Sequence, residues 1–318
     1  MFKNKNLKLN KFYSLKLLSK LLFLNIILLL LFIYIEKNNN NKIKVCVCTV
    51  VKKENKYIKE FVEHYKSYKV DKIFIYDNND INGERFDDIL YEHLKSNYVK
   101  ILNYRGKEAK QLDKFQNCYN NNNKYYDWLI FYDVDEYINL RNLTNIKDFL
   151  SLNQFKKCKS IYLNWVIHTD NNLLYYDNRT LKQRFPKKYM NKKYCNGKTI
   201  IRGNINGIKM ETTHLLDRKM ERCNGFGKIF KPRGIFCKKP DFKYYYIDHY
   251  FSKSTEEFVN KIQRGGGVLY NSTKNKYLRI NLYFRFNKIT VEKINYISQK
   301  AHLNASIIMK NIKFNISN

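Results

Sequence analysis

The sequence has few of the residues that interrupt regular structure. Of its 318 residues, 3 are proline and 11 are glycine, which excludes a collagen-like chain and a repeat rich in proline and glycine. Hydrophobic residues make up 44% and aromatic residues 16%, which excludes a wholly disordered chain. The length is that of one large domain or two small ones.

Acidic residues are also scarce. Aspartate and glutamate together number 28, against 60 lysines and arginines, which gives a formal net charge of +32. Such a charge favours phosphate-bearing partners or an anionic membrane surface, although a codon preference for A and T would enrich lysine and asparagine in the same way. No basic helix, zinc-finger spacing or aromatic RNA-binding motif stands out, so no specific nucleic-acid partner is expected.

The seven cysteines include no C-x-x-C pair of the kind that binds zinc. Cys46 and Cys48 lie two apart in a strand-like run, so we expect both on one face of a strand, packed in the core. In an oxidising compartment the other five would form two disulfides and leave one thiol, with the pairing undetermined by the sequence. These five are Cys118, Cys158, Cys195, Cys223 and Cys237.

An apolar run near the N-terminus predicts a membrane anchor. Residues 21–35 read LLFLNIILLLLFIYI, and with the leucines ahead of them they approach the ~20 residues that span a bilayer. Residues 1–20 would be a basic cytosolic tail, because positive flanks stay in the cytosol, and residues 36–42 a polar linker. We therefore expect a single-pass type II protein held in the membrane by this helix, with its soluble domain in the lumen of the Golgi or endoplasmic reticulum. A cleaved signal peptide is the alternative.

Sequons for N-glycosylation follow the linker, as in a lumenal glycoprotein, although an asparagine-rich chain carries several by chance. They begin at Asn142, Asn178, Asn271, Asn304 and Asn315.

Strand-like and helix-like segments alternate between residues 42 and 132. The strand-like segments are apolar throughout, as in strands buried on both faces, and the helix-like segments carry apolar side chains at helical spacing. This alternation predicts an α/β domain with a mostly parallel sheet and flanking helices, whose ligands bind beyond the carboxyl ends of the strands. The expected strands are 42–51, 72–76, 98–103 and 128–132, and the expected helices are 54–68, 84–95 and 108–120.

The pattern changes in the second half of the chain, where regular segments are shorter and less regularly spaced. The expected helices there are 146–152, 255–263 and 291–309, and the expected strands are 160–168, 198–202 and 207–213.

The most informative segment is DWLIFYDVDEYI, residues 127–138. An apolar strand ends there and delivers two aspartates, Asp133 and Asp135, in a D-x-D spacing. Carboxylate oxygens are the ligands that Mg²⁺ and Mn²⁺ prefer, and a short acidic pair leaves coordination positions for phosphate and water. A divalent ion at such a site neutralises a diphosphate leaving group. A solvated acidic turn is the alternative, but the full apolar strand ahead of the pair favours a metal and nucleotide site.

Several further motifs occur in a fixed order around this segment. Together they resemble the glycosyltransferases of the GT-A fold grouped as family 92, and their relatives in the family 2-like set. The resemblance spans residues 43–267, although Phe61 stands where the family has tryptophan and the order of Glu54 and Asn55 is reversed. The motifs are 51–55, 61–65, 70–78, 127–137, 197–202 with His214, and 248–261.

The resemblance implies a Rossmann-like GT-A domain over residues 43–270, followed by a helical extension over 271–318. It implies a hexosyltransferase that moves a sugar from a nucleotide-diphosphate donor to a glycan or glycoprotein hydroxyl, using Mn²⁺ or Mg²⁺. A UDP-sugar donor, UDP-galactose in particular, and inversion of configuration are implied by the resemblance alone.

Four further residues are candidates for binding the nucleotide. Glu54 follows the first strand and Asp77 ends the second, where an acid can accept hydrogen bonds from ribose or base. A helix N-terminal acid and an Asx turn are their respective alternatives. Lys198 and Arg202 lie in one basic strand and would meet the diphosphate, or would simply be solvated.

The remaining site candidates come in pairs between which the sequence does not choose. His214 or His249 would complete the metal ligands, as a late histidine does in the resembled fold. Asp170 or Glu211 would be the base that an inverting transfer needs to take the proton of the acceptor hydroxyl.

Three other functions fit parts of the sequence. A nucleotidyltransferase would need a glycine-rich phosphate loop after the first strand, and residues 50–54 contain no glycine. A membrane-tethered basic protein would bind polyanions in a strongly salt-dependent way. A catalytically inactive GT-A-like binding module is the third, and the intact D-x-D-E argues against it.

Overall fold

The computed structural model describes residues 20–31, 43–107, 110–189, 196–214, 217, 219–230, 242–264 and 273–316. The chain divides into two compact units, residues 1–43 and residues 44–318. The polar linker 36–42, nearly all of the basic tail, and Cys195, Cys237 and Asn271 lie outside the described residues.

In the first unit, residues 20–31 form a helix with exposed leucines and isoleucines. Within the described part of the chain, no helix has the length and apolarity needed to cross a membrane. The predicted transmembrane helix over 21–35 is therefore corrected.

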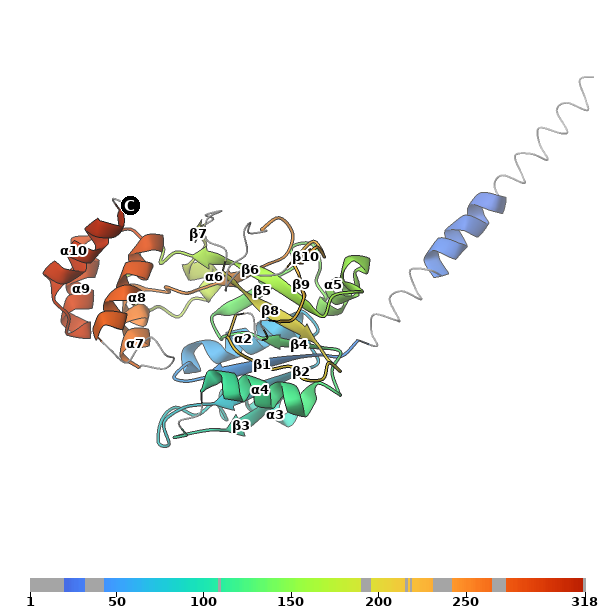
Figure 1. Ribbon diagram of the computed structural model, residues 1–318, viewed down its shortest axis with the longest axis horizontal. Coiled ribbons are helices and arrows are strands. Elements are labelled where there is room, and N and C mark those ends of the chain that lie inside the picture. The colour runs from blue at the N-terminus through green and yellow to red at the C-terminus, as the bar shows by residue number, and fades with distance from the viewer. Residues whose placement is uncertain are drawn as a thin grey trace, which may run out of the picture. The chain divides into compact units, whose positions relative to one another are not determined.

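The second unit is an α/β structure around a large mixed sheet (Figure 1). Its main path runs in the order β10-β9-β6-β8-β4-β1-β2-β3, and β5, β7 and β11 pair beside it. The first strands are β1 (Val45–Val51), β2 (Lys72–Asp77), β3 (Val99–Asn103) and β4 (Trp128–Phe131), which are parallel to one another.

The prediction of a mostly parallel sheet is confirmed for these four strands but is wrong for the whole sheet, which is mixed. Beyond β4 comes β8 (Gly197–Arg202), which runs antiparallel to both β4 and β6 (Ser160–His168). The β11 strand (Tyr246–His249) is parallel to β6 and antiparallel to β5 (Glu136–Asn139). The short strands are β7 (Lys188–Tyr189), β9 (Arg222–Cys223) and β10 (Ile229–Phe230).

Two helices cover opposite faces of the parallel strands. The α2 helix (Asn55–Ser67) buries Ile58, Phe61, Val62 and Tyr65, the apolar positions that predicted it. On the other face, α4 (Gln111–Asn122) packs Phe115 and Cys118 into a cluster that includes Cys46 and Cys48. Because strand residues alternate between faces, Cys46 and Cys48 share the α4 face, as predicted.

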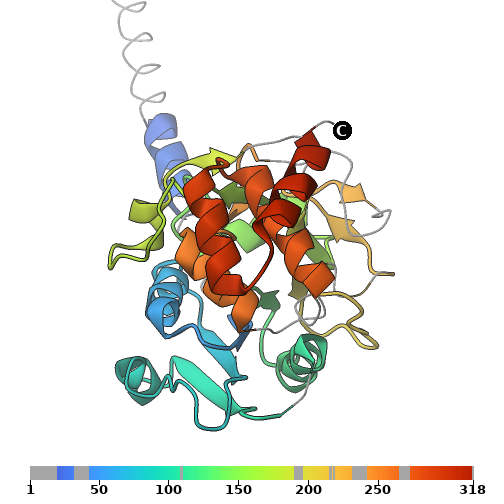
Figure 2. The same cartoon turned by 90° about the vertical axis from the view of Figure 1, so that its left-hand side faces the viewer.

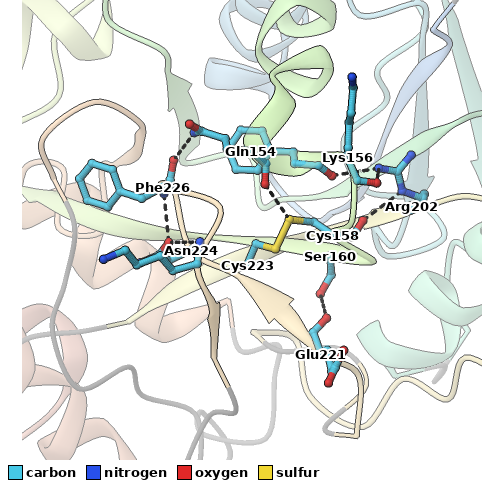
Figure 3. Close-up of a disulfide and its surroundings, with 12 residues drawn as sticks. Gln154, Lys156, Cys158, Ser160, Arg202, Glu221, Cys223, Asn224 and Phe226 are labelled. Carbon is cyan, nitrogen blue, oxygen red and sulfur yellow. Dashed lines mark hydrogen bonds between the residues drawn. A yellow bond between two sulfur atoms is a disulfide. The ribbon is translucent and has the colours of Figure 1, made fainter.

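Two disulfides join elements that are distant in sequence. Cys48 bonds to Cys118 and ties β1 to α4, whereas the sequence suggested only core packing for Cys48. Cys158 bonds to Cys223 and ties the start of β6 to β9 (Figure 3). Cys46 stays a buried thiol.

Some helices are shorter or more divided than predicted. The 84–95 prediction is helical only at α3 (Tyr91–Lys95), and 291–309 is split into α9 (Val291–Ala301) and α10 (Ala305–Ile316) by the left-handed His302 (φ 54°). The 207–213 strand prediction is wrong, because those residues are irregular in the structure. The other helices are α5 (Ile146–Ser151), the 3₁₀ turn η1 (Asn153–Phe155), α6 (Leu181–Arg184), α7 (Thr255–Gln263) and α8 (Thr273–Phe286).

The C-terminal helices α7 to α10 lie together at one end of this unit (Figure 1), where they face the viewer in Figure 2. They belong to the same compact unit as the sheet.

Candidate active site

The shared direction of the parallel strands brings acidic side chains from distant parts of the chain to one side of the sheet, at the carboxyl ends of these strands. β1, β2 and β4 are parallel, so their carboxyl ends lie on the same side of the sheet. The acidic residues that end or follow these strands lie along that side, and they are Glu54, Asp77 and Asp133. Lys198 reaches this side because β8 runs in the opposite direction and begins there.

The D-x-D segment forms a tight turn after β4. The amide of Asp133 donates to Glu136 Oε2 (3.0 Å), and the amide of Glu136 donates to the Asp133 carbonyl (3.0 Å). The Asp133 carboxylate is held by Lys198 Nζ (2.8 Å) and by the side-chain amide of Gln111 (2.6 Å). Burial raises the pKa of Asp133, but the Lys198 ammonium outweighs it and holds the pKa below its usual range.

Asp135 points into a cluster with Glu136 and His249, all of which are buried. One ligand atom from each lies within 4.8 Å of the others, the spacing of a metal-binding set. Asp135 Oδ1 is 3.7 Å from His249 Nε2, and its other oxygen is 2.6 Å from Lys261 Nζ. Asp133 is not part of this set.

The electrostatics of the cluster suit a cation. Burial raises the pKa of Glu136 well above its usual value, although Lys198 opposes the shift. Burial lowers the pKa of His249 to about 3, against the opposing charge of Asp135, so its imidazole is neutral and able to act as a ligand at neutral pH. A divalent ion would add positive charge beside Glu136, whose Oε1 lies 3.5 Å from Lys198 Nζ. Two carboxylates and one imidazole therefore fit a divalent transition-metal ion such as Mn²⁺.

His214 lies near this set but outside it. Trp165 packs against both candidate histidines, with ring centroids 4.2 Å from His249 and 5.0 Å from His214. His214 Nδ1 is 3.1 Å from the Gly197 carbonyl oxygen. Burial and the neighbouring Lys198 lower the pKa of His214 to about 4. Of the two histidines, the geometry places His249 with the carboxylates.

Glu54 and Asp77 are both buried and both carry cationic partners. Glu54 accepts from Lys253 Nζ (3.2 Å) and from the Arg264 guanidinium (2.6 Å). Asp77 accepts from Arg105 (2.8 Å) and, in an Asx turn, from the amide of Asn79 (3.0 Å). The Asx turn, which was the alternative interpretation of Asp77, is therefore present. The second carboxylate oxygen of Asp77, Oδ2, faces Arg105.

Arg202 does not join the cluster. It lies at the opposite end of β8 from Lys198, where its guanidinium donates to the carbonyls of Cys158 (3.0 Å) and Phe155 (3.1 Å), beside the disulfide (Figure 3). It also stacks on Trp128 at 4.2 Å. Lys198 and Arg202 are four residues apart in β8, so they lie near the two opposite ends of that strand.

The two candidate bases differ in exposure and in partners. Asp170 follows β6 and is buried, and one of its carboxylate oxygens contacts both Lys293 Nζ (2.5 Å) and the Tyr283 hydroxyl (2.6 Å). Glu211 is exposed, in the irregular segment that leads to His214.

The structure adds residues to which the sequence gave no role. Glu136 follows the D-x-D directly, and Lys253 and Lys261 belong to the motif at 248–261. The sequence motifs therefore include these three residues but do not show what their side chains contact. Gln111 and Arg105 stand in no motif, and only the packing of α4 and of the loop after β3 brings them to the site.

The acidic cluster and the potential metal set lie beyond the carboxyl ends of the parallel strands, where α/β sheets bind their ligands. Residues 41–264, most of the chain, match the sequence model of glycosyltransferase family 92. The chain belongs to this family and is a glycosyltransferase, as the resemblance predicted.

Solved structures with a similar arrangement include TarS from S. aureus. Its 1–349 crystal structure matches with a TM-score of 0.37 and 11% identity, covering 81% of this chain and 70% of that one. The same segment in complex with UDP-GlcNAc matches with a TM-score of 0.38 and 12% identity, covering 81% of this chain and 82% of that one. No curated protein matches the chain.

Proposed function

We propose that this glycosyltransferase moves a sugar from a nucleotide-diphosphate donor, a UDP-sugar, to a hydroxyl of a glycan or glycoprotein. The observation that carries the proposal is the convergence of Asp135, Glu136 and His249 beyond the carboxyl ends of the parallel strands, in a chain of family 92. UDP-galactose as donor and inversion of configuration are carried by the family resemblance.

Asp135, Glu136 and His249 would hold a divalent ion, which neutralises charge on a diphosphate leaving group. The imidazole favours Mn²⁺ over Mg²⁺, because Mg²⁺ prefers oxygen ligands and imidazole suits transition metals. Asp133 stays a proposed contact to the ion or the nucleotide, oriented by Lys198 and Gln111.

The cations around the cluster suit the donor's phosphates. Lys198 and Lys261 are each held beside an aspartate of the D-x-D, close to where a diphosphate would bind. Glu54 and Asp77, at the ends of β1 and β2, are proposed to face the nucleoside, where their oxygens accept hydrogen bonds from hydroxyl or base N–H groups.

For the base we propose Glu211 rather than Asp170. Glu211 is exposed to an incoming acceptor, whereas the Asp170 carboxylate is buried and bound by Lys293 and Tyr283. We also propose an oxidising compartment, the lumen of the Golgi or endoplasmic reticulum, because disulfides persist there and are rare in the cytosol.

The test is calorimetry of the full chain with UDP, in the presence and absence of Mn²⁺, Mg²⁺ and Zn²⁺. We expect UDP binding that requires Mn²⁺ and is lost in Asp135→Asn and in His249→Ala. Asp88→Asn, at an exposed aspartate, is the matched control and should bind like the unmodified protein. UDP binding that needs neither metal nor Asp135 would overturn the metal site, and no binding of UDP would overturn the UDP-sugar donor.

A panel of UDP-sugars, with UDP release as the readout, then identifies the donor. The anomeric proton of the product, followed by NMR, decides between inversion and retention. Loss of transfer with retained UDP binding in Glu211→Gln would support Glu211 as the base, and full activity of that variant would exclude it.

A further inference from the structure

The segment between β11 and α7 carries a lysine in an unfavourable backbone conformation. Lys253 has φ 53°, in the left-handed region that residues other than glycine seldom occupy. Such a conformation is unfavourable for a residue with a side chain and persists only where the surroundings hold it. Residues 251–255 are all buried, so the packing around this segment decides its shape.

Two side chains of α8 and its C-terminal end bind this segment on both sides of Lys253. Before it, the side-chain amide of Asn287 donates to the Ser252 hydroxyl (2.8 Å). After it, the Thr255 hydroxyl lies 2.8 Å from the Tyr283 hydroxyl. Hydrogen bonds from α8 and from the residue that follows it therefore hold the segment on both sides of Lys253.

Asp170 forms hydrogen bonds with both Asn287 and Tyr283. The Asp170 amide donates to Asn287 Oδ1 (2.6 Å), and its carboxylate accepts from the Tyr283 hydroxyl (2.6 Å). The Tyr283 proton is used in that bond, so Thr255 donates in the other. Lys293 of α9 lies 2.5 Å from the same carboxylate and neutralises it. All of these groups are buried, where a polar network stabilises only if every member is satisfied.

Lys253 connects this network to the candidate active site. Its ammonium lies 3.2 Å from Glu54 Oε2 and over the Tyr57 ring. The other oxygen of Glu54 accepts from Arg264, whose guanidinium also binds the carbonyl of Lys52 (2.8 Å). The backbone at Lys253 therefore places one of the two cations that hold the Glu54 carboxylate.

We propose that the C-terminal helices α8 and α9 position Lys253, and through it Glu54, for binding of the donor nucleotide. Asp170, Tyr283, Asn287 and Lys293 act as positioning residues. This inference rests on the proposed function, because the nucleotide is the ligand that Glu54 is proposed to contact. It gives the helices beyond residue 264, where the family match ends, a part in donor binding.

The test compares two hydroxyl deletions on one helix in the full chain. Tyr283→Phe removes the hydroxyl that joins Thr255 to Asp170. Tyr277→Phe is the matched control on α8, where the hydroxyl accepts only from the Asn304 amide (3.1 Å) among the hydrogen bonds described. We expect Tyr283→Phe to raise the Kd for UDP with Mn²⁺ roughly tenfold, at a temperature well below the Tm of both variants, and Tyr277→Phe to leave it unchanged.

A double-mutant cycle separates positioning from general loosening. If Tyr283 acts through Lys253, Tyr283→Phe will change the Kd little once Lys253→Met is present, because coupled residues are not additive. Additive effects, or an unchanged Kd in Tyr283→Phe, would overturn the inference.

Amide hydrogen exchange gives a readout without the nucleotide. Residues 250–258 should exchange faster in Tyr283→Phe than in Tyr277→Phe. If the unmodified protein binds no UDP, the proposed function fails, and unchanged exchange would still overturn the role of the helices separately.

Discussion

Lys261 Nζ lies 2.6 Å from Asp135 Oδ2, so a lysine of α7 holds the second aspartate of the D-x-D. The charges of Lys261 and other cations lower the pKa of Asp135 far below its usual range, although burial opposes them. Asp135 is one of the three residues with metal-binding spacing. The same carboxylate therefore has two candidate cations, the lysine and a divalent ion.

We expect Lys261→Met to bind Mn²⁺ more tightly in the absence of nucleotide. The substitution removes a cation that neutralises the largely buried Asp135 and leaves that charge to the ion, so the Kd for Mn²⁺ should fall several-fold. Calorimetric titration with Mn²⁺ measures the change. Lys59→Met, at an exposed lysine of α2, is the control. Weaker Mn²⁺ binding in Lys261→Met would show that the lysine does not compete with the ion.

The same variant should bind UDP more weakly once Mn²⁺ is saturating. Lys261 would then be released from Asp135 to face the diphosphate, and Lys261→Met cannot supply that charge. Titration with UDP at saturating Mn²⁺ measures this effect. An unchanged Kd for UDP would place the phosphates away from Lys261.

Removing one partner of the buried Arg184–Glu257 pair should destabilise the fold. Arg184 donates to Glu257 Oε2 (2.7 Å), and both side chains are almost fully buried. Arg184→Met would leave an unpaired buried carboxylate, which costs about 3 kcal/mol of unfolding free energy. The double variant Arg184→Met/Glu257→Met should be more stable than Arg184→Met alone. Urea unfolding measures both, and equal stability of the two would contradict the account.

The same pair predicts a pH dependence. Burial raises the pKa of Glu257, but hydrogen bonds from Arg184, Ser254 and Tyr57 outweigh it and leave the pKa below its usual value. A depressed pKa stabilises the fold above the unfolded value of about 4.3, and the stabilisation is lost as the pH falls through the folded pKa. Between pH 5 and 3, Glu257→Gln should therefore lose less stability than the unmodified protein. Exposed Glu92→Gln should follow the unmodified protein throughout.

Loss of the Cys158–Cys223 bridge should lower stability by about 3 kcal/mol. The bridge closes a long loop, with a sequence separation of 65, and constrains the unfolded chain. Urea unfolding of Cys158→Ala/Cys223→Ala measures the change. Cys46→Ala removes a buried thiol but no bridge, so it is the control and should lose about 1 kcal/mol. Equal losses in the two would mean that the bridge does not form.

The sequence alone determined the features that depend on neighbouring residues. Apolar runs such as 128–131 are strands, and the Thr255–Gln263 helix has the bounds that its amphipathic pattern predicts. The D-x-D follows directly from its strand, and the motif order was enough to predict the family. Each of these is a local pattern, set by the period of side chains along one element.

The tertiary structure decided which distant groups meet. The antiparallel direction of β8 puts Lys198 beside Asp133 and sends Arg202 to the opposite end of the strand, a choice that strand propensity does not encode. The cysteine pairs, the placement of His249 rather than His214 beside Asp135, and the binding of Asp170 by Lys293 all depend on packing between elements far apart in sequence. The local periodicity of side chains determines which face of a helix or strand is buried. Strand order and helix packing determine which other element that face contacts. The candidate site consists of side chains from elements brought together in this way.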